Sequence, residues 1–598
     1  MAEVPAEKGR PGGLAHNPTQ PQITVLDAGG QYCHLIARRV RELGVFSEVR
    51  ASETPAGELA GRKGIIISGG PSSVSAAGSP TADPAVFGLG AGVLGICYGQ
   101  QLMAHLLGGA VRKGVKGEYG AAELEVSDDR SLLAGMSAQE RVWMSHFDQV
   151  EKVPPGFTVL ASTSTCAVAA MADPARRLYG VQFHPEVVHT AKGMEVLSTF
   201  LFGICGCEKD WDPRARLAEL EREIAAGAAG RNVFFFVSGG VDSSVAYQLC
   251  LRALGKDRVH GAYVDTGLMR EGETEFVRGA LGVEVVDARG EFLEALREAT
   301  DPEAKRHIIG EQFVAVQERV LQSGHYLDGE WILGQGTIYP DTIESGGTAK
   351  ADLIKTHHNR VAGIQKLIDE KRILEPLSSF YKDEVREVGR ALGLPEELLH
   401  RHPFPGPGLG IRLLCTDSSG AVERMGPGWL LPVRSVGVQG DERTYRAVLA
   451  LENVTWNSSL HEQATQQINQ YAGINRVVAL CGGYVGLEKM RVMPARIDAV
   501  RLERLRRADA IVRRVSRESG FEEKVWQFPV VMIPCGTPER PDSVVLRPIH
   551  SVDGMTAQSV LMDEGVRERI TSELLAIDGI AAVFYDLTHK PPGTIEWE

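Results

Sequence analysis

A cysteine at a tight turn, followed later in the chain by a histidine and a glutamate, could carry out nucleophilic chemistry. Cys97 lies between an apolar run, 93–96, and a helix-forming segment, 102–107. A thiol on such a turn is exposed to a substrate, and the N-terminal end of the helix favours its thiolate. His184 and Glu186 are two residues apart, and on an extended strand their side chains would face the same way. His184 can then activate Cys97 while Glu186 orients the imidazole.

A glycine-rich turn could complete this site. Ser68-Gly69-Gly70-Pro71 follows the strand-like run 65–67 and can present backbone N–H groups to an oxyanion, as acyl transfer requires. Each signal has a simpler explanation when taken alone. Most free cysteines are small buried hydrophobes, a lone histidine is more often structural, and a Gly-Pro turn often has no function. The combination is more specific than its parts.

A second motif could bind phosphate groups. It lies between the apolar run 232–237 and a helical segment, 243–254, and it reads Ser238, Gly239, Gly240, Val241, Asp242, Ser243 and Ser244. Glycines let the backbone approach a phosphate, hydroxyls donate hydrogen bonds, and the helix N-terminus adds partial positive charge. The Gly-Lys-Ser/Thr ending of a Walker loop is missing, so γ-phosphate chemistry is not indicated. Asp242 could help to hold Mg²⁺, and the simpler alternative is an ordinary Gly-Ser turn.

Parallel sheets would position both motifs. Short apolar runs alternate with helical patterns from Ile23 to about residue 205, which indicates a mostly parallel sheet covered by helices. The runs 232–237 and 260–264 enclose a helical segment and indicate a second α/β unit. The Pro/Gly cluster at 402–408 cannot continue a helix and is expected to end that unit.

Composition excludes several classes of protein. The 598 residues are 43% hydrophobic and 24% charged, enough for several ordinary cores. The net charge of −13 argues against nucleic acid as the main partner. We expect a cytosolic protein, because the chain shows no apolar run of membrane-spanning length and no apolar N-terminal signal segment. The nine cysteines are expected to be reduced thiols, and the Cys205/Cys207 pair lacks the neighbouring ligands of a metal site.

Residues 22–205 resemble a class I glutamine amidotransferase domain. In that family the Cys, His and Glu triad forms a glutamyl thioester and releases ammonia. The resemblance implies that the nucleophile is Cys97, the base His184 and its partner Glu186. It also implies an oxyanion hole made by Gly70 and the Tyr98 amide.

One segment of this domain departs from the family. Residues 143–148 match a stretch that usually reads Ser-His-Gly-Asp, and Phe147 stands where the family has glycine. Glycine adopts backbone conformations that phenylalanine avoids. The local backbone, and with it glutamine binding or coupling to the rest of the chain, is therefore in question.

The loop at 238–244 resembles that of the ATP pyrophosphatases. This loop occurs in several ligases, so the flanking segments decide the substrate. Those that resemble GMP synthetase segments are 263–270, 333–341, 355–359, 380–386 and 402–408. The resemblance implies that ATP and Mg²⁺ are bound by the loop together with Val264 and Lys382, and that XMP is adenylated and then aminated to GMP. The alternatives are a glutamine-dependent NAD synthetase and a catalytically silent nucleotide-binding scaffold.

The C-terminal residues 590–598 match, almost residue for residue, the stretch that closes over XMP in GMP synthetases. The resemblance implies that Lys590 meets the XMP phosphate and Glu596 its base or ribose. Further candidates for the same pocket are Arg270, Gln527 and Arg547.

The C-terminal region is longer than in short bacterial GMP synthetases, where this domain pairs two subunits. It contains a weak internal echo: 448–451, a helical stretch and 473–478 resemble 544–546, a helical stretch and 579–584. Two similar α+β subdomains would explain the echo, and chance similarity explains it equally well. We expect a monomer whose single chain supplies both halves, with a homodimer as the alternative.

The expected fold class is α/β. We expect a flavodoxin-like amidotransferase domain, a parallel-sheet domain like the adenine nucleotide α-hydrolases, and an α+β region of two related subdomains. We expect a disordered tail at 1–20, the amidotransferase domain at 21–208 and the ATP pyrophosphatase domain at 209–412. The first C-terminal subdomain, dimerisation-like and with an insertion, is expected at 413–540, and the second, with the XMP-binding tail, at 541–598.

Overall fold

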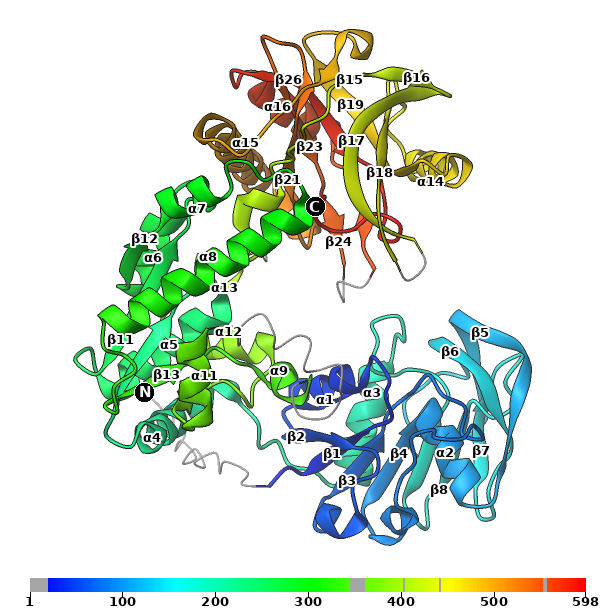
Figure 1. The fold of residues 1–598 in the computed structure, drawn as a ribbon. Coiled ribbons are helices and arrows are strands. Elements are labelled where there is room, and N and C mark those ends of the chain that lie inside the picture. Colours follow the sequence, from blue (N-terminus) through cyan, green and yellow to red (C-terminus); the bar gives the residue numbers. More distant parts are fainter. Residues whose placement is uncertain (1–19, 345–360, 402–403, 440–441, 552–555) are drawn as a thin grey trace, which may run out of the picture. The chain divides into compact units, whose positions relative to one another are not determined.

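The computed structural model describes residues 20–344, 361–401, 404–439, 442–551 and 556–598 (Figure 1). The chain forms two compact units, the first ending at Arg216 and the second beginning at Leu217. The predicted tail before residue 20, the 355–359 segment and His402-Pro403 lie outside the described residues. The segment boundaries predicted within the second unit stay predictions.

A nine-stranded sheet forms the centre of the first unit, in the order β2-β1-β3-β4-β9-β8-β7-β5-β6. Its strands are β1 (Ile23–Asp27), β2 (Ser47–Ala51), β3 (Gly64–Ile67), β4 (Gly92–Ile96), β5 (Ala110–Val126), β6 (Gln139–Lys152), β7 (Thr158–Ser162), β8 (Ala170–Asp173) and β9 (Leu178–Val181). Its α-helices are α1 (Cys33–Glu42), α2 (Tyr98–Leu106) and α3 (Gly193–Ser198). The parallel half confirms the predicted α/β character. The prediction of a mostly parallel sheet is wrong for the other half, because β8, β7, β5 and β6 pair antiparallel.

The parallel half of this sheet explains how distant residues meet. β3, β4 and β9 are adjacent and parallel, with Gly95 of β4 opposite Gly180 of β9. All four residues of β3 and all five of β4 are buried, as expected for parallel strands covered on both faces. Since carboxyl ends of neighbouring parallel strands share one edge, the segments after β3, β4 and β9 converge there.

A five-stranded parallel sheet, β12-β11-β10-β13-β14, begins the second unit. The strands are β10 (Asn232–Phe236), β11 (Val259–Asp265), β12 (Glu284–Asp287), β13 (Trp331–Gly334) and β14 (Ile373–Leu374). The helices are α4 (Leu217–Ala228), α5 (Val241–Leu254), α6 (Glu273–Leu281), α7 (Arg289–Ala295), α8 (Pro302–Ser323), α9 (Tyr339–Glu344), α11 (Ala362–Asp369), α12 (Lys382–Ala391) and α13 (Glu396–Leu399). The strand order reverses between β10 and β13, and ligands of open α/β sheets bind at such a point.

The rest of the second unit contains a seven-stranded sheet, β16-β17-β18-β19-β26-β23-β21, a three-stranded sheet, β15-β20-β22, and a two-stranded sheet, β24-β25. The strands of this region are β15 (Gly420–Ala421), β16 (Glu423–Met425), β17 (Gly428–Gln439), β18 (Glu442–Leu451), β19 (Ile474–Gly483), β20 (Arg491–Val492), β21 (Val530–Ile533), β22 (Cys535–Gly536), β23 (Asp542–Leu546), β24 (Ile549–His550), β25 (Gln558–Ser559) and β26 (Ile580–Asp586). Its helices are α14 (Ser459–Gln470), α15 (Ala499–Glu518) and α16 (Glu564–Leu575).

The two segments of the sequence echo form corresponding elements in this sheet. β18, α14 and β19 make one β-α-β unit with parallel strands, and β23, α16 and β26 make the other. β19 and β26 pair antiparallel at the centre, with Ala479 opposite Tyr585. This is the strand order that a two-fold repeat produces. One sheet runs through both halves, and β21 pairs with β23 across the predicted 540/541 boundary.

All nine cysteines are free, as predicted, and Cys205 and Cys207 hydrogen-bond to each other. Within the described residues, no helix combines the length and the apolar character needed to cross a bilayer.

Candidate functional site

Cys97 alone forms the turn between β4 and α2. Its backbone is held at φ 51° and ψ −104°, a conformation that side-chain-bearing residues rarely adopt and that clusters at functional sites. The flanking glycines are required by close packing: a Cβ on Gly95 would lie 2.5 Å from the Gly99 backbone, and one on Gly99 would lie 2.2 Å from the Ile67 carbonyl oxygen. The predicted cysteine elbow is therefore present.

His184 and Glu186 lie beside this elbow. The Nδ1 of His184 is 2.6 Å from Oε1 of Glu186, and a hydrogen bond links the imidazole to the Cys97 thiol. Burial lowers the pKa of His184, but the charge of Glu186 and the hydrogen bond with Cys97 outweigh it, so this pKa lies well above the ordinary value. All three side chains are buried. The groups needed for thiol activation are already in contact.

The backbone that presents His184 and Glu186 differs from the prediction. β9 ends at Val181, so both residues lie just beyond the strand and not on it. Hydrogen bonds fix the segment instead, from Thr190 Oγ1 to the His184 carbonyl at 2.6 Å and from Arg39 Nε to the Glu186 carbonyl at 3.0 Å. The two side chains meet because hydrogen bonds from neighbouring residues hold this segment. The i, i+2 spacing alone could not predict these bonds.

The predicted oxyanion residues also reach the elbow. A Cβ on Gly69 would lie 3.2 Å from Cε1 of His184, and one on Gly70 would lie 3.4 Å from Cγ of Tyr98. Tyr98 is the first residue of α2, and the first N–H groups of a helix have no partner four residues earlier. The structure therefore brings Gly70 and Tyr98 together next to Cys97.

Gln182 is a residue of this site to which sequence analysis gave no role. Its Nε2 lies 3.4 Å from Cys97 Sγ, and its Oε1 accepts a hydrogen bond from Nε2 of Gln101 at 3.1 Å. Both glutamines are buried. An N–H group that points at the sulfur stabilises a thiolate. The available signal was a polar residue inside the apolar stretch that leads to His184.

The backbone of Phe147 does not need the positive φ angle that glycine allows. It lies within β6 and is not among the residues with positive φ. Its side chain is 38% exposed, and Nζ of Lys113 lies 5.5 Å from the ring centroid. The backbone question raised by this substitution is thus answered, and its effect on glutamine binding or coupling stays open to experiment.

The motif at 238–244 forms a turn between β10 and α5. Gly239 has φ 74°, and the hydroxyls of Ser238 and Ser243 lie 2.9 Å apart across the turn. Ser238 Oγ also accepts a hydrogen bond from the Gly240 N–H at 3.2 Å. Gly336, after β13, packs so closely that an added Cβ would lie 2.7 Å from the Ser243 nitrogen. Loops from two adjacent strands therefore meet at the point where the strand order reverses.

Asp242, in the first turn of α5, has oxygen chemistry that fits a hard cation. Its Oδ2 lies 3.6 Å from Nζ of Lys382, while its buried Oδ1 has no hydrogen-bond partner among the described residues. Burial raises the pKa of Asp242, Lys382 opposes that shift and Asp341 adds to it. Mg²⁺ prefers such carboxylate oxygens. Val264 is buried near the end of neighbouring β11.

Glu596 in the C-terminal segment is held by a buried arginine that sequence analysis did not single out. Arg412 donates from Nε and Nη2 to the two carboxylate oxygens of Glu596 at 3.0 and 2.7 Å. Arg270 lies beside this pair, with Nε 3.2 Å from Oδ2 of Asp509 and its guanidinium 4.4 Å from the Phe404 ring. Burial lowers the pKa of Arg270 to about 10, although the nearby Asp509 raises it. Nη1 of Arg412 also lies 3.9 Å from Oδ1 of Asp509. Arg270 and Glu596 therefore belong to one network.

Arg547 anchors the same C-terminal segment from another side. It is fully buried and donates to Oδ2 of Asp586 at 2.7 Å and to the Ile595 carbonyl at 2.9 Å. The Trp597 indole N–H donates to the same Asp586 oxygen at 2.9 Å. The XMP role implied for Arg547 stays a prediction, because the observed contacts are to the protein.

Lys590 and Gln527 are placed by their main chains. Lys590 exchanges backbone hydrogen bonds with Ala557, at 2.7 and 3.1 Å, and Gln527 pairs in the same way with Ile549. These contacts fix the two residues at the edges of the short strands that precede α16. Their implied contacts with XMP stay predictions.

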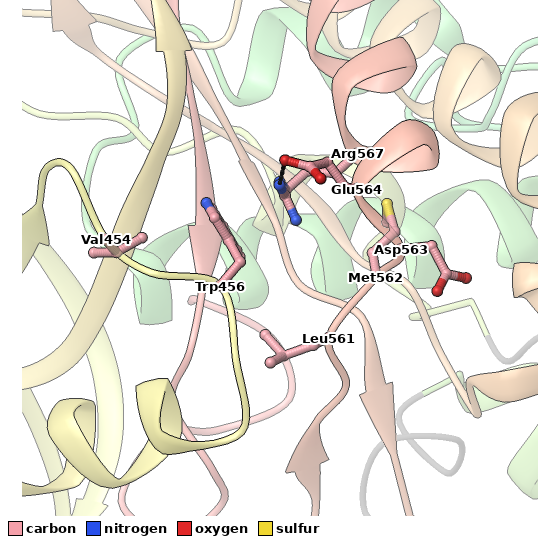
Figure 2. A pocket seen from close by; sticks show the side chains of 7 residues that line it. All are labelled: Val454, Trp456, Leu561, Met562, Asp563, Glu564 and Arg567. Atoms are coloured by element: carbon pink, nitrogen blue, oxygen red, sulfur yellow. Dashed lines mark ion pairs between the residues drawn. The ribbon is translucent and has the colours of Figure 1, made fainter.

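A separate cavity of about 480 Å³ lies in the C-terminal region (Figure 2). Trp456, Met562, Glu564 and Arg567 are among its lining residues, and the Arg567 guanidinium lies 4.0 Å from the Trp456 ring. None of the residues predicted for XMP lines it. The cavity is therefore distinct from the predicted nucleotide contacts.

The cysteine elbow and its His-Glu pair, at the carboxyl edge of the parallel half of the sheet, define the first unit as a class I glutamine amidotransferase. The family model described as glutamine amidotransferase class-I matches residues 24–204. A second family model, GMP synthase C terminal domain, matches residues 514–597.

Relatives match the chain along almost its whole length. A probable GMP synthase (glutamine-hydrolyzing) of Leptospira interrogans is 42% identical and covers 96% of this chain and 99% of its own. The GMP synthase of Symbiobacterium thermophilum is also 42% identical with the same coverage. That of Parasynechococcus marenigrum is 40% identical over 97% of this chain and 98% of its own. The chain belongs to the glutamine-hydrolyzing GMP synthase family, which confirms the resemblance found in the sequence.

Proposed function

We propose that this chain aminates XMP to GMP, taking ammonia from glutamine and energy from ATP. One observation carries the proposal: a contacting Cys97–His184–Glu186 triad and a phosphate-binding turn at 238–244 occur in one chain. Its relatives, aligned from end to end, are named GMP synthases. A glutamine-dependent NAD synthetase would normally release ammonia in a domain of a different fold, without this cysteine elbow and His-x-Glu pattern.

In the glutamine half-reaction, the Cys97 thiolate attacks the side-chain amide carbon. The N–H groups of Gly70 and Tyr98 stabilise the oxyanion that forms. His184, held by Glu186, gives a proton to the departing ammonia, and a glutamyl thioester remains. His184 then removes a proton from water, which attacks the thioester and releases glutamate.

In the synthetase half-reaction, the C2 oxygen of XMP attacks the α-phosphorus of ATP. Pyrophosphate leaves into the turn at 238–244, whose N–H groups and hydroxyls donate hydrogen bonds to its oxygens. Val264 and Lys382 complete the ATP site. Mg²⁺, held by Asp242, would supply further charge neutralisation to the pyrophosphate. Ammonia then displaces AMP from the adenylated XMP and gives GMP.

The proposed XMP contacts are Lys590 for the phosphate, Glu596 for the base or ribose, and Arg270, Gln527 and Arg547 around them. A cation suits the phosphate, and a carboxylate suits hydroxyl and N–H donors. Arg412 supports this assignment for Glu596, because the two hydrogen bonds it donates hold the carboxylate in one orientation.

We infer further that the two sheets of the second unit correspond to an adenine nucleotide α-hydrolase-like domain and an internally duplicated α+β region. The antiparallel pairing of β19 with β26 supports the duplication. Because one chain then supplies both halves, the proposed oligomeric state is a monomer. The proposed location is the cytosol. Gel filtration with light scattering at micromolar protein tests the oligomeric state, and a stable dimer would contradict the monomer.

Product analysis tests the activity directly. The chain is incubated with ATP, Mg²⁺ and glutamine and with XMP, IMP or deamido-NAD as acceptor, and nucleotides are separated by chromatography. We expect AMP, pyrophosphate and GMP when XMP is the acceptor, and none of these products with IMP or deamido-NAD. AMP formation with deamido-NAD but not XMP would favour the NAD synthetase alternative. Absence of AMP with every acceptor would leave only a silent scaffold.

A further inference from the structure

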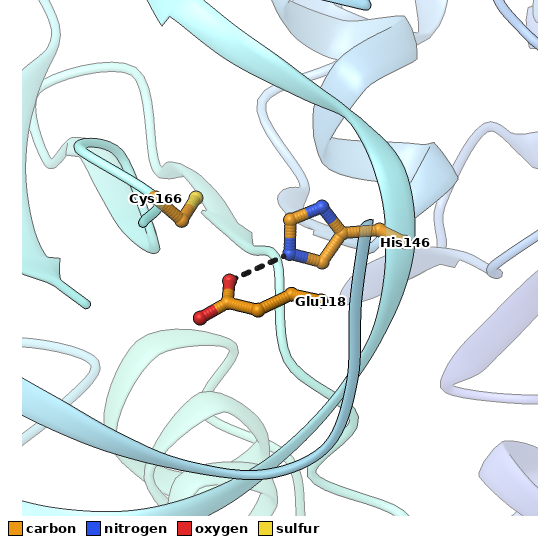
Figure 3. A group of neighbouring side chains, drawn as sticks. All are labelled: Glu118, His146 and Cys166. Atoms are coloured by element: carbon orange, nitrogen blue, oxygen red, sulfur yellow. Dashed lines mark hydrogen bonds and ion pairs between the residues drawn. The ribbon is translucent and has the colours of Figure 1, made fainter. Parts of the chain in front are cut away.

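Among the residues that the structure describes, a single group of three metal-ligating side chains stands together (Figure 3). Glu118 of β5, His146 of β6 and Cys166 of the β7–β8 connection place their ligand atoms within 4.8 Å of one another. Glu118 and His146 are directly opposite in the antiparallel β5–β6 pair, so their side chains share one face. Strand register therefore brings a carboxylate and an imidazole to a thiol.

The hydrogen bonding of His146 suits a metal ligand. Its Nδ1 lies 3.0 Å from the Asp148 carbonyl oxygen, which can only accept, so this contact places a hydrogen on Nδ1. Nε2 of the neutral ring then directs its lone pair toward Oε2 of Glu118, 3.1 Å away. Two acceptors at this distance need a cation between them, either a proton or a metal ion. Metal-binding histidines usually donate their other ring N–H to a carbonyl or carboxylate, as here.

A second set of contacts fixes the other two side chains. Thr163 Oγ1 donates to Oε1 of Glu118 at 2.8 Å and accepts from the Cys166 N–H at 3.0 Å. The Thr163 N–H also donates to the Cys166 carbonyl at 2.8 Å. One threonine thus holds both the carboxylate and the loop that carries the thiol. Such support is typical of built metal sites, in which second contacts orient the ligands.

Charge and geometry favour a soft divalent ion. A zinc-type cation balances one carboxylate and one thiolate, leaving a neutral buried site with the neutral imidazole. Tetrahedral coordination places ligand atoms roughly 3.3–3.6 Å apart. The His146–Glu118 distance of 3.1 Å is close to that value. The Cys166 sulfur, within 4.8 Å of both ligand atoms, must approach each of them by about 1.2 Å at most. Cysteine binds zinc as the thiolate, so binding releases the thiol proton.

We propose that Glu118, His146 and Cys166 bind a thiophilic divalent cation of the zinc class, with one atom each and a fourth position for water. On binding, Cys166 Sγ loses its proton to water and forms a bond to the metal, as do Nε2 of His146 and Oε2 of Glu118. No electron is transferred. Mg²⁺ does not compete, because it requires oxygen ligands.

This site lies next to the nucleophile, so the test must separate the two thiols. Cys97 Sγ donates to the carbonyl of Ser145, the residue before His146, at 3.6 Å. The alternative explanation of the cluster is a protonated His146 paired with Glu118, with no metal. Full-length protein is prepared reduced and stripped of metal with a chelator, then titrated with Co²⁺ and with Zn²⁺.

Cobalt binding is followed by absorption spectroscopy, and zinc affinity is measured by calorimetry. We expect one equivalent in the wild type, with a thiolate-to-cobalt charge-transfer band that Cys97→Ser and the remote control Cys205→Ser retain. Cys166→Ser should lose the band and bind zinc at least ~10-fold more weakly. A band that persists in Cys166→Ser or vanishes in Cys97→Ser, or a wild type that binds no zinc, overturns the proposal. If Cys166→Ser fails to fold, Glu118→Gln decides, and zinc affinity equal to that of the wild type would refute the site.

Discussion

The two reactive regions are built in different ways. In the first unit, Cys97, His184 and Glu186 are buried and already contact one another. At the phosphate turn of the second unit, Asp242 Oδ1 and Ser244 Oγ are buried, and neither has a hydrogen-bond partner in the part of the chain that the structure describes. In the first region the reactive groups bond to one another, although Glu186 Oε2 has no hydrogen-bond partner among the described residues. The second region leaves a carboxylate oxygen and a hydroxyl that a ligand would satisfy.

This difference follows from the proposed chemistry. A thiol must be activated before the substrate arrives, so its base and the partner of that base have to be in place. A nucleotide supplies its own charge, so its site needs aligned N–H groups, hydroxyls and oxygen ligands whose bonds are completed on binding. Substitutions in the first region should therefore act on glutamine use alone, and substitutions in the second on both nitrogen sources.

The largest expected effect comes from Cys97→Ala. Glutamine-dependent GMP formation should fall by roughly 10⁴-fold or more, because the nucleophile is lost. The ammonia-dependent reaction should be unchanged, since the second unit is untouched. Both rates are measured by chromatography of GMP, with Cys205→Ala as a buried-thiol control. Loss of the ammonia-dependent rate as well would contradict the separation of the two regions.

Asp242→Asn should lower GMP formation by roughly 100-fold with either nitrogen donor, because a charged oxygen ligand is removed. Glutamate release from glutamine in the absence of XMP and ATP should be unaffected. Asp257→Asn is the control, at an exposed aspartate in the turn that follows the same helix. The comparison between the regions fails if Asp242→Asn slows only the glutamine-dependent reaction.

Glu186→Gln should slow glutamine hydrolysis by roughly 10- to 100-fold, because His184 loses its orienting charge. The pKa of His184, raised above 6.5 in the wild type, should drop in the variant, since burial alone lowers this pKa. A raised folded-state pKa contributes stability that is present below pH 6.5 and is lost as pH rises through the folded value. Thermal melts at pH 6 and pH 9 should therefore differ less in the variant. An identical pH difference in both proteins would refute the role of Glu186.

Arg412→Lys should have the smallest effect. Lysine keeps the charge but cannot donate the two parallel hydrogen bonds to Glu596, which costs about 1–3 kcal/mol of folding free energy. Carboxypeptidase should then release Trp597 and Glu598 faster than from the wild type. The exposed Arg491→Lys serves as control. Unchanged release would show that Arg412 does not hold the C-terminal segment.

Local patterns in the sequence were enough to find both reactive turns. The strand, small residue, nucleophile and helix order around Cys97, and the Ser-Gly-Gly-x-Asp-Ser order at 238–244, are read within a few residues. Backbone sterics decide such turns locally, because only glycine tolerates the close approaches at Gly95 and Gly99. The sequence echo in the C-terminal region likewise marked the two β-α-β units.

Other features depend on contacts between distant residues. Whether β5 to β8 run parallel or antiparallel, and which arginine holds Glu596, cannot be read from spacing. Arg412 and Glu596 are 184 residues apart, and Gln182 and Cys97 are 85 apart. Such pairs form only when strands and helices close around them.

The sequence by itself therefore determined the family, and it predicted the candidate reactive groups and the turns that carry them. Tertiary structure alone decided that Gln182 faces the thiol, that His184 and Glu186 stand beyond their strand, and that Glu118, His146 and Cys166 meet. The physical reason is that turn conformation depends on neighbouring residues, whereas the environment of a buried polar group depends on every element packed around it.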